Sequence, residues 1–430
     1  MNEQSDEQAG PAHEKLPDPR LDRQLRIPVW DQQALEEARI AVFGDNDLLA
    51  SLYVLSAAAL GLNNIVLIAP TWHLGLMKTA RHVNPKLRLA VVEGLYTHPI
   101  LDEIFWPCTA IVDLTHYALA NKLLLEKAFR SGVPVVRGLC RKENGMEGLT
   151  IFTYRRGREW QELSEVVSPS NLPCDHFDDG ILDLVAAGIA LEETKNLVMG
   201  HRVSENVIGY KRPTVVTRGA ATRVGIVGAG ALGNFVGLGL ALAGVQSVTV
   251  IDPDVVDVTN LNRQVFLAGG IGRSKAEVLC ERLHALFGIQ AAARVAYLRR
   301  NTELTGYDVL FDCVDNFETR VILSERCRDE GKVLISGGTG PEAGQVIVFD
   351  PARGNGTPAE VLGLYEIVER RAIDVYQRET ASCAYQPEPS VVMTNQIIGG
   401  LMVDACRLLL DGGEARNVFY DSRSDARILM

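Results

Sequence analysis

The sequence predicts an α/β protein built from two Rossmann-like units in tandem, the first of them degenerate. Three observations support this fold class. A glycine-rich turn follows a short apolar strand at 224–227, a carboxylate ends the next predicted strand at 247–251, and the chain before residue 200 repeats this pattern in altered form. Strands that alternate with helical stretches are typical of a doubly wound parallel sheet. We therefore expect the second unit to bind a nucleotide.

The glycine-rich turn has the spacing G-x-G-x-x-G, formed by Gly228, Gly230 and Gly233. The first glycine permits a tight turn, the second lets the backbone approach a phosphate, and the third lets the helix pack closely on the strand. The helix N-terminus offers N–H donors to anionic oxygen. Asp252, at the end of the second strand, is suited to accept hydrogen bonds from ribose hydroxyls.

The residues after Asp252 favour phosphate chemistry over hydride transfer. A nicotinamide-dependent dehydrogenase has no need of more polar and cationic groups here. This chain nevertheless supplies Asn260, Arg263, Gln264 and Lys275. Lys275 follows the expected helix cap, Ser274, so its ammonium group and the helix dipole would reinforce each other near an anion.

A further carboxylate is expected at the carboxyl edge of the sheet. The stretch 308–320 predicts a fourth strand that ends in Asp315 and Asn316. Ligands bind at this edge in doubly wound folds. Asp315 is therefore the candidate Mg²⁺ ligand, sharing the ion with nucleotide phosphates, and Asn316 is expected beside it. Arg320 is expected either to orient the Asp315 loop or to make an ion pair on a helix surface.

This set of residues resembles the adenylation domain shared by ubiquitin-activating enzymes and the ThiF/MoeB sulfur-carrier adenylyltransferases. The resemblance covers residues 218–411 and includes the N-L-N-R-Q block at 260–264. It implies two ThiF-type adenylation domains, with ATP and Mg²⁺ bound by the positions named above. The implied reaction is attack of the C-terminal carboxylate of a small β-grasp carrier protein on the α-phosphate, which gives an acyl-adenylate and pyrophosphate.

The first half is expected to be a scaffold without nucleotide. In the repeat, Asn46 and Leu49 stand where the second and third glycines stand, Ala69 replaces the ribose acid, and His116 replaces the magnesium carboxylate. Leucine would crowd the contact between helix and strand, alanine cannot bind ribose, and histidine is a poor Mg²⁺ ligand. The alternative for His116 is a hydrogen-bonded structural residue.

The expected organisation follows from this repeat. The two halves within one chain would form a pseudo-dimer. The expected segments are a disordered tail at 1–20, a degenerate adenylation domain at 21–200, a linker at 201–222, and an active adenylation domain at 223–430 with a catalytic-cysteine loop around 351–390.

Two residues are implicated in catalysis by the resemblance. The D-R-Q-L-R-I block at 22–27 resembles the opening of the non-catalytic half of eukaryotic activating enzymes, whose arginine reaches into the partner's ATP site. This implies that Arg23 does so here; the alternative is an exposed arginine near a domain entrance.

Cys383 lies in a Pro-flanked loop before the closing helix, where compact relatives carry their nucleophile. Its alternative is a loop cysteine without chemistry.

Composition narrows the class of protein further. The chain has 430 residues and a net charge of −11, which argues against nucleic acid as the main partner. A polar N-terminus and the absence of a long apolar run predict no membrane segment and a cytoplasmic protein. Eight cysteines without a C-x-x-C pair predict reduced thiols and no zinc site.

Three functions are therefore compared. The first is ATP-dependent activation of a ubiquitin-like protein, as in bacterial ubiquitin-like conjugation operons, with transfer of the carrier to Cys383 and then to a conjugating enzyme. The second is a sulfur-carrier adenylyltransferase for cofactor or tRNA sulfuration. The third is a nucleotide sensor or an oxidoreductase, which the intact set of phosphate-directed residues disfavours. The fused degenerate half favours the first over the second.

Overall fold

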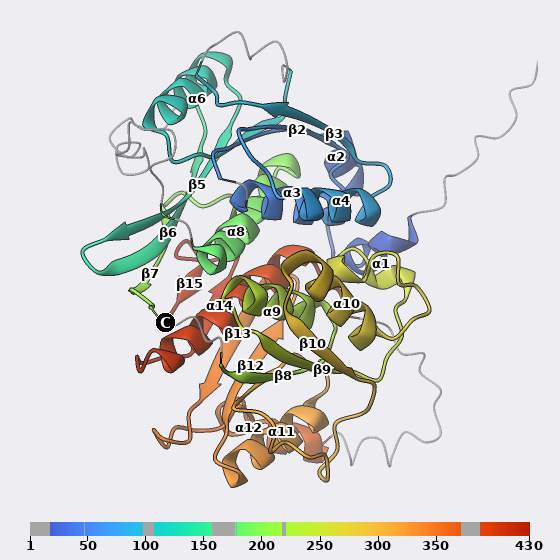
Figure 1. Ribbon diagram of the computed structural model, residues 1–430. Coiled ribbons are helices and arrows are strands. Elements are labelled where there is room, and N and C mark those ends of the chain that lie inside the picture. The colour runs from blue at the N-terminus through green and yellow to red at the C-terminus, as the bar shows by residue number, and fades with distance from the viewer. Residues whose placement is uncertain are drawn as a thin grey trace, which may run out of the picture.

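The computed structural model describes residues 18–46, 48–97, 107–156, 177, 179–216, 221–370 and 388–430. Most of the expected tail, Cys383 and residues 371–380 of the charged helix expected before it lie outside these ranges. Within them the chain forms two α/β halves, one coloured blue to light green in Figure 1 and the other yellow-green to red. The predicted α/β class is confirmed.

The first half contains a sheet of seven described strands in the order β3-β2-β1-β4-β5-β6-β7. Its strands are β1 (Arg39–Gly44), β2 (Asn64–Ala69), β3 (Arg88–Glu93), β4 (Ala110–Leu114), β5 (Val135–Glu143), β6 (Met146–Tyr154) and β7 (Ile208–Pro213). Its helices are η1 (Pro19–Leu21), α1 (Asp22–Leu25), α2 (Gln32–Glu37), α3 (Leu49–Leu60), α4 (Leu74–Val83), α6 (Ala118–Ser131) and α8 (Gly180–Val198). Neighbours from β1 to β5 pair in parallel, and β6 and β7 pair antiparallel.

The second half repeats this topology in eight described strands ordered β10-β9-β8-β11-β12-β13-β14-β15. Its strands are β8 (Arg223–Val227), β9 (Ser247–Ile251), β10 (Gln290–Arg294), β11 (Val309–Asp312), β12 (Val333–Thr339), β13 (Ala343–Phe349), β14 (Val418–Asp421) and β15 (Ile428–Leu429). Its helices are α9 (Ala231–Leu242), η3 (Val258–Asn260), η4 (Val265–Leu267), α10 (Lys275–Phe287), α11 (Phe317–Asp329), α12 (Pro358–Val361) and α14 (Val392–Leu410).

The internal repeat extends to the register of the strands. Phe43 of β1 lies opposite Asp113 of β4, and Val227 of β8 lies opposite Asp312 of β11. These residues occupy corresponding places in the two halves, and both aspartates are fully buried. The structure therefore supports the pairing of positions that the sequence suggested, including Ala69 with Asp252.

The two halves pack through α8 and α14, which lie side by side between the sheets (Figure 1). Gly188 and Gly400 are each the ninth residue of their helix. A Cβ on Gly188 would lie 2.7 Å from Cγ1 of Ile397, and one on Gly400 would lie 2.5 Å from Cγ2 of Val185. Each helix therefore receives a branched side chain of the other at the same position, and one hydrophobic core runs through both halves.

One strand was not expected. The sequence suggested an irregular linker at 201–222, but Ile208–Pro213 form β7 and pair with β6. The strand was not predicted because one of its inward positions carries a charged side chain. Arg212 is at that position and is only 2% exposed. It forms ion pairs with Glu147 and, at 2.6 Å, with Asp404 on α14. The inward positions Ile208 and Tyr210 are apolar, but Arg212 interrupts the alternation after these two positions, and its carboxylates lie far away in sequence.

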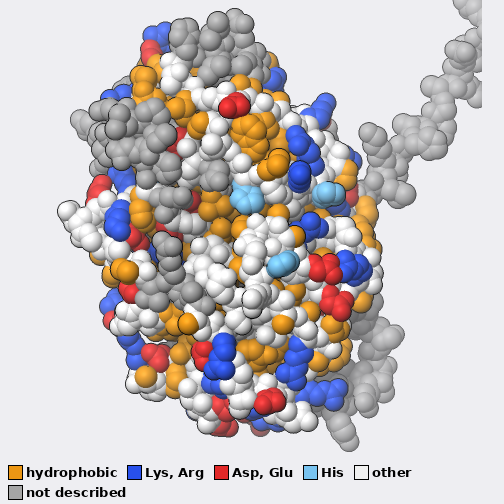
Figure 2. Space-filling view, viewed as in Figure 1, with side chains coloured by type: hydrophobic (Ala, Val, Ile, Leu, Met, Phe, Trp, Pro, Cys, Tyr) orange, Lys and Arg blue, Asp and Glu red, His pale blue; other side chains and the backbone are white. Residues whose placement is uncertain are grey.

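Other expected elements are present. The helices expected near 181–199 and 394–410 are α8 and α14, and the expected C-terminal strand pair is β14 with β15. On the face shown in Figure 2, side chains of both charges are interspersed. Among the described helices, none combines the length and apolar character needed to cross a bilayer.

Candidate nucleotide site

The glycine turn joins β8 to α9 and leaves the helix N-terminus without a side-chain cap. Gly228 has φ +101°, a conformation that residues with a Cβ rarely adopt. A Cβ on Gly233 would lie 1.9 Å from the Gly228 carbonyl oxygen, so only glycine fits there. Gly230 is the N-cap residue, and it has no side-chain oxygen to accept the first N–H groups of α9. These donors are available to an anion.

Asp252 lies beside this turn. Its carboxylate accepts hydrogen bonds from the backbone N–H groups of Ala229, at 2.6 Å, and Asp254, at 2.8 Å. Burial raises the pKa of Asp252 in spite of these hydrogen bonds. The side chain therefore ties the end of β9 to the glycine turn, and each oxygen keeps a lone pair for a further donor.

Lys275 begins α10 directly after its cap, Ser274, as expected. The chain between β9 and α10 folds back, so that the Lys275 Nζ lies 2.8 Å from Oδ2 of Asp254. The side chain of Lys275 is 11% exposed and that of Asp254 is 56% exposed. The ammonium group is therefore held near Asp252 by a partner that is itself largely in solvent.

Arg263 is a buried cation between the two halves. Its Nη1 donates to the carbonyl of Thr259 at 2.9 Å and to Oδ1 of Asn262 at 2.8 Å. Burial, together with repulsion by Arg23, lowers the pKa of Arg263 to about 10. No ion pair joins Arg263 to any other described residue. A negative charge bound next to Arg263 would therefore be stabilised.

Asn260 and Gln264 flank Arg263 in different ways. The side-chain oxygen of Asn260 accepts the backbone N–H of Asp257, which closes the turn η3. Gln264 is buried, and its Oε1 has no hydrogen-bond partner among the described residues. Its Nε2 lies 3.9 Å from where a Cβ on Gly230 would be. Gln264 therefore presents polar atoms to the glycine turn.

Asp315 lies just beyond the sheet, in a loop held by Arg320. The fourth strand ends at Asp312, three residues before the expected end. Asp312 forms a buried ion pair with Arg320 at 3.1 Å, and Nη2 of Arg320 donates to the carbonyls of Val314 and Gly337. These bonds support the loop-orienting role of Arg320 over a surface ion pair. Asp315 is exposed, and no ion pair to another described residue involves it.

The residues at this edge fit a Mg²⁺ ion shared with phosphates. Asp315 supplies one carboxylate that forms no ion pair with the other described residues. Asp312, in contrast, already pairs with Arg320 and accepts a hydrogen bond from the Ser336 hydroxyl. Asn316 caps α11, because its Oδ1 accepts the N–H of Thr319 at 2.8 Å. One carboxylate plus substrate phosphates is a common way for proteins to hold this ion.

Arg23 reaches this site from the first half. Its Nη1 donates to the carbonyl of Glu388, at 3.1 Å, and its charge adds to burial in lowering the pKa of Arg263. The Nε atom is buried without an acceptor among the described residues. Arg23 is half-buried and contacts the second half, which favours a position at the site over that of an exposed arginine near a domain entrance. Its part in catalysis stays a prediction.

The corresponding site in the first half is occupied by its own side chains. Oδ1 of Asn46 accepts the N–H groups of Leu48, at 3.1 Å, and Leu49, at 2.8 Å, and so caps α3 where a phosphate would bind. His116 is buried; it contacts Asp45 through Nδ1 and accepts the N–H of Cys140 on Nε2. The structural alternative for His116 is thus supported.

We expect one nucleotide to bind per chain, because Asn46 uses the helix donors of the first half and Ala69 offers no ribose acceptor. Calorimetric titration of the protein with Mg·ATP should give a stoichiometry of one. Binding of two ATP molecules would show that the first half retains a working site.

The described cysteines of the second half are packed thiols. Burial raises the pKa values of Cys280, Cys327 and Cys406 to about 12, and that of Cys313 well above its usual value. Almost no thiolate would form on them at neutral pH, and the thiolate is the nucleophilic form. Cys383 lies outside the described residues, so its role stays a prediction.

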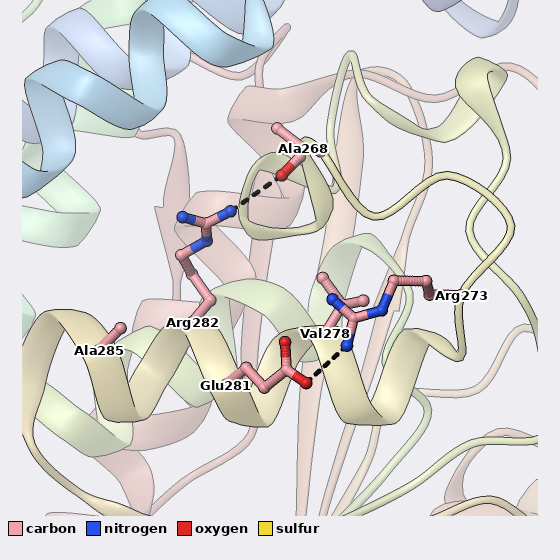
Figure 3. A pocket seen from close by; sticks show the side chains of 7 residues that line it. Ala268, Arg273, Val278, Glu281, Arg282 and Ala285 are labelled. Atoms are coloured by element: carbon pink, nitrogen blue, oxygen red, sulfur yellow. Dashed lines mark hydrogen bonds and ion pairs between the residues drawn. The ribbon is translucent and has the colours of Figure 1, made fainter.

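A separate hollow of about 200 Å³ lies on α10 (Figure 3). Its two arginines are already engaged: Arg282 donates to the Ala268 carbonyl at 2.9 Å, and Arg273 pairs with Glu281 at 2.5 Å. No residue of the predicted nucleotide site lines it. We assign it no role.

Three residues of the site were not predicted from the sequence. Asp254 holds Lys275, and Gln24 and Asn262 join the N-terminal segment to Arg263. Asn262 lies within the quoted N-L-N-R-Q block and could have been singled out from it. Gln24 likewise lies within the D-R-Q-L-R-I block, whereas nothing local in the sequence distinguishes Asp254.

A doubly wound sheet with this glycine turn and strand-end acid defines the class of nucleotide-binding Rossmann-like proteins. Residues 212–423 match the model of the ThiF family. The SAMP-activating enzyme E1 of Haloferax volcanii is 32% identical over 221 residues, which cover 47% of this chain and 73% of that protein. The chain belongs to the ThiF family.

Other similar proteins match over shorter stretches. The adenylyltransferase and sulfurtransferase uba4 of Aspergillus terreus is 37% identical over 140 residues, covering 30% of this chain and 28% of that protein. MOCS3 of Mus musculus, also an adenylyltransferase and sulfurtransferase, is 35% identical over 160 residues and 34% of each chain. The chain thus spans about a third of these two relatives. A crystal structure of E. coli MccB has a TM-score of 0.41 at 18% identity, covering 49% of this chain and 64% of that one.

Proposed function

We propose that this protein activates a ubiquitin-like protein at the expense of ATP. A C-terminal carboxylate oxygen of the carrier attacks the α-phosphorus, the bond to the bridging oxygen breaks, and pyrophosphate leaves. The Cys383 thiolate then attacks the acyl carbon, AMP departs, and a conjugating enzyme receives the carrier. The observation that carries the proposal is the group of cations and N–H donors at one sheet edge, with one cation supplied by the other half.

The roles within the site follow from its chemistry. The uncapped N-terminus of α9, Lys275 and Arg263 would bind phosphate oxygens, and Asp252 would accept from the ribose. Asp315 would hold Mg²⁺, which supplies charge neutralisation when bound. Bringing a carboxylate to an anionic phosphate requires such preorganised positive charge. Asn260, Gln264 and Asn316 would complete the nucleotide site.

The proposed domain organisation keeps residues 21–200 as a degenerate partner and 223–430 as the active domain. The reciprocal contacts of Gly188 and Gly400 support a pseudo-dimer within one chain. A sulfur-carrier adenylyltransferase is the second candidate, because the names of several relatives combine adenylyltransferase with sulfurtransferase. The fused first half, whose own site is capped by Asn46, favours ubiquitin-like activation.

The test is ATP–pyrophosphate exchange in the presence of a β-grasp carrier protein. Exchange that requires the carrier would support the proposal, and reduction of NAD(P) without exchange would contradict it. Formation of a thiol-sensitive adduct with the carrier separates the two candidates, since only the first requires a thioester on this protein.

Replacement of Arg23 by alanine is expected to slow carrier-dependent exchange by roughly ten- to a thousandfold, the scale for losing one positioned transition-state cation. The reason is that Arg23 brings a half-buried guanidinium from the first half to the site of Arg263. Arg26, four-tenths exposed and paired with Asp22, gives a matched control as Arg26→Ala. An unchanged exchange rate in Arg23→Ala would remove the arginine from the catalytic site.

A further inference from the structure

Two buried amide side chains join the first half to Arg263. Gln24 on α1 and Asn262 in the loop after η3 are each 0% exposed. Nδ2 of Asn262 donates to Oε1 of Gln24 at 3.0 Å, although the two residues are 238 positions apart in the chain. Buried amide groups need hydrogen-bond partners for their remaining polar atoms as well. Those partners show which part of the site the contact supports.

These other partners give the amides a single orientation. Nε2 of Gln24 donates to the Leu60 carbonyl at 2.8 Å and to Oε1 of Gln32 at 2.7 Å. At the other end, Oδ1 of Asn262 accepts from Nη1 of Arg263 at 2.8 Å. A carbonyl can only accept and a guanidinium can only donate. Turning either amide over would therefore place NH₂ against a donor or oxygen against oxygen.

The chain of hydrogen bonds from Gln24 through Asn262 to Arg263 is called the relay here. It holds Arg263 without neutralising its charge. Both acceptors of its Nη1, the Thr259 carbonyl and the Asn262 amide, are uncharged. Among the described residues, Arg263 makes no hydrogen bond through Nε or Nη2, so these donors remain available for an anion. A carboxylate in place of Asn262 would fix the guanidinium equally well but would compete with phosphate for its charge.

We propose that Gln24 and Asn262 are positioning residues for Arg263, through which the first half sets the orientation of a cation in the second half's site. The proposal rests on the proposed function, in which Arg263 binds phosphate. Breaking the relay leaves the charge in place but lets the guanidinium turn. The expected result is a fall in kcat for exchange of roughly ten- to a hundredfold, as for other small misplacements of catalytic groups, with KM for ATP little changed.

The test is a double-mutant cycle on exchange with Gln24→Met and Arg263→Ala. If Gln24 acts through Arg263, Gln24→Met lowers kcat in the wild type but has almost no further effect in Arg263→Ala. An equal fold-loss in both backgrounds would overturn the proposal, because a general structural defect would act in both. If Gln24→Met does not fold, Asn262→Leu, which breaks the relay on the other side, takes its place in the cycle.

A control and a second readout separate this proposal from the proposed function. Gln33→Met makes the same substitution at an exposed glutamine bonded to Glu37, and it should leave kcat unchanged. Rotation of the Arg263 guanidinium about Nε–Cζ, measured by ¹⁵N NMR on the protein without carrier, should be faster in Gln24→Met than in the wild type, because Asn262 then loses the partner that orients it toward Nη1. Unchanged rotation would overturn the relay even if the protein proved inactive with every carrier.

Discussion

Replacement of Asp315 by alanine is expected to reduce carrier-dependent ATP–pyrophosphate exchange at least ~100-fold while the protein stays folded, the scale for losing one preorganised charge contact. Asp315 is the exposed carboxylate beyond β11, and its loop is held by Arg320, so its removal takes the proposed Mg²⁺ ligand away without creating a cavity. Exchange should be measured at several Mg²⁺ concentrations, because a weakened metal site also raises the Mg²⁺ requirement.

The control for this experiment is Glu318→Ala, which removes an exposed carboxylate in the first turn of α11, three residues further along. It should leave exchange nearly unchanged. If Asp315→Ala is folded by thermal melting and exchanges pyrophosphate as fast as the wild type, the assignment of Mg²⁺ to Asp315 is wrong.

Replacement of Cys383 by alanine is expected to preserve exchange and to abolish a thiol-sensitive adduct with the carrier protein. Adenylation needs no thiol, whereas capture of the acyl-adenylate requires a nucleophile that is ionised near neutral pH. The packed cysteines of the second half do not meet this need, because burial raises their pKa values. The adduct should be followed by electrophoresis with and without a reducing thiol.

Cys280→Ala is the matched control, since Cys280 is a buried thiol on α10 and its loss should leave the adduct intact. Persistence of the adduct in Cys383→Ala would identify another residue as the nucleophile. If the wild type exchanges pyrophosphate but never forms an adduct, sulfur transfer becomes the better proposal.

Features encoded by local spacing were predictable from the sequence. The glycine turn, the strand-end Asp252 and the cap of α10 each depend on a few consecutive residues, and all are present in the structure. The degenerate repeat was also visible, because both halves retain their strands in the same order.

Features that depend on distant partners were not predictable. Arg212 made β7 look like a linker, since the carboxylates that stabilise its charge lie on β6, on α14 and at the start of α8. The fourth strand ends at Asp312, whose buried side chain pairs with Arg320, a residue of the following helix. The contact of Gln24 with Asn262 exists only once the two halves have packed together.

The packing of α8 against α14 has a consequence for how the site responds to dilution. Arg23 and Arg263 belong to opposite halves, yet the halves are segments of one polypeptide and share one core. An active site assembled from two separate subunits loses members as the protein is diluted below its dissociation constant, whereas covalent linkage replaces that bimolecular step by an intramolecular one. In the proposed arrangement the first half would therefore stay beside the second at any protein concentration, and no separate subunit would be needed to supply Arg23.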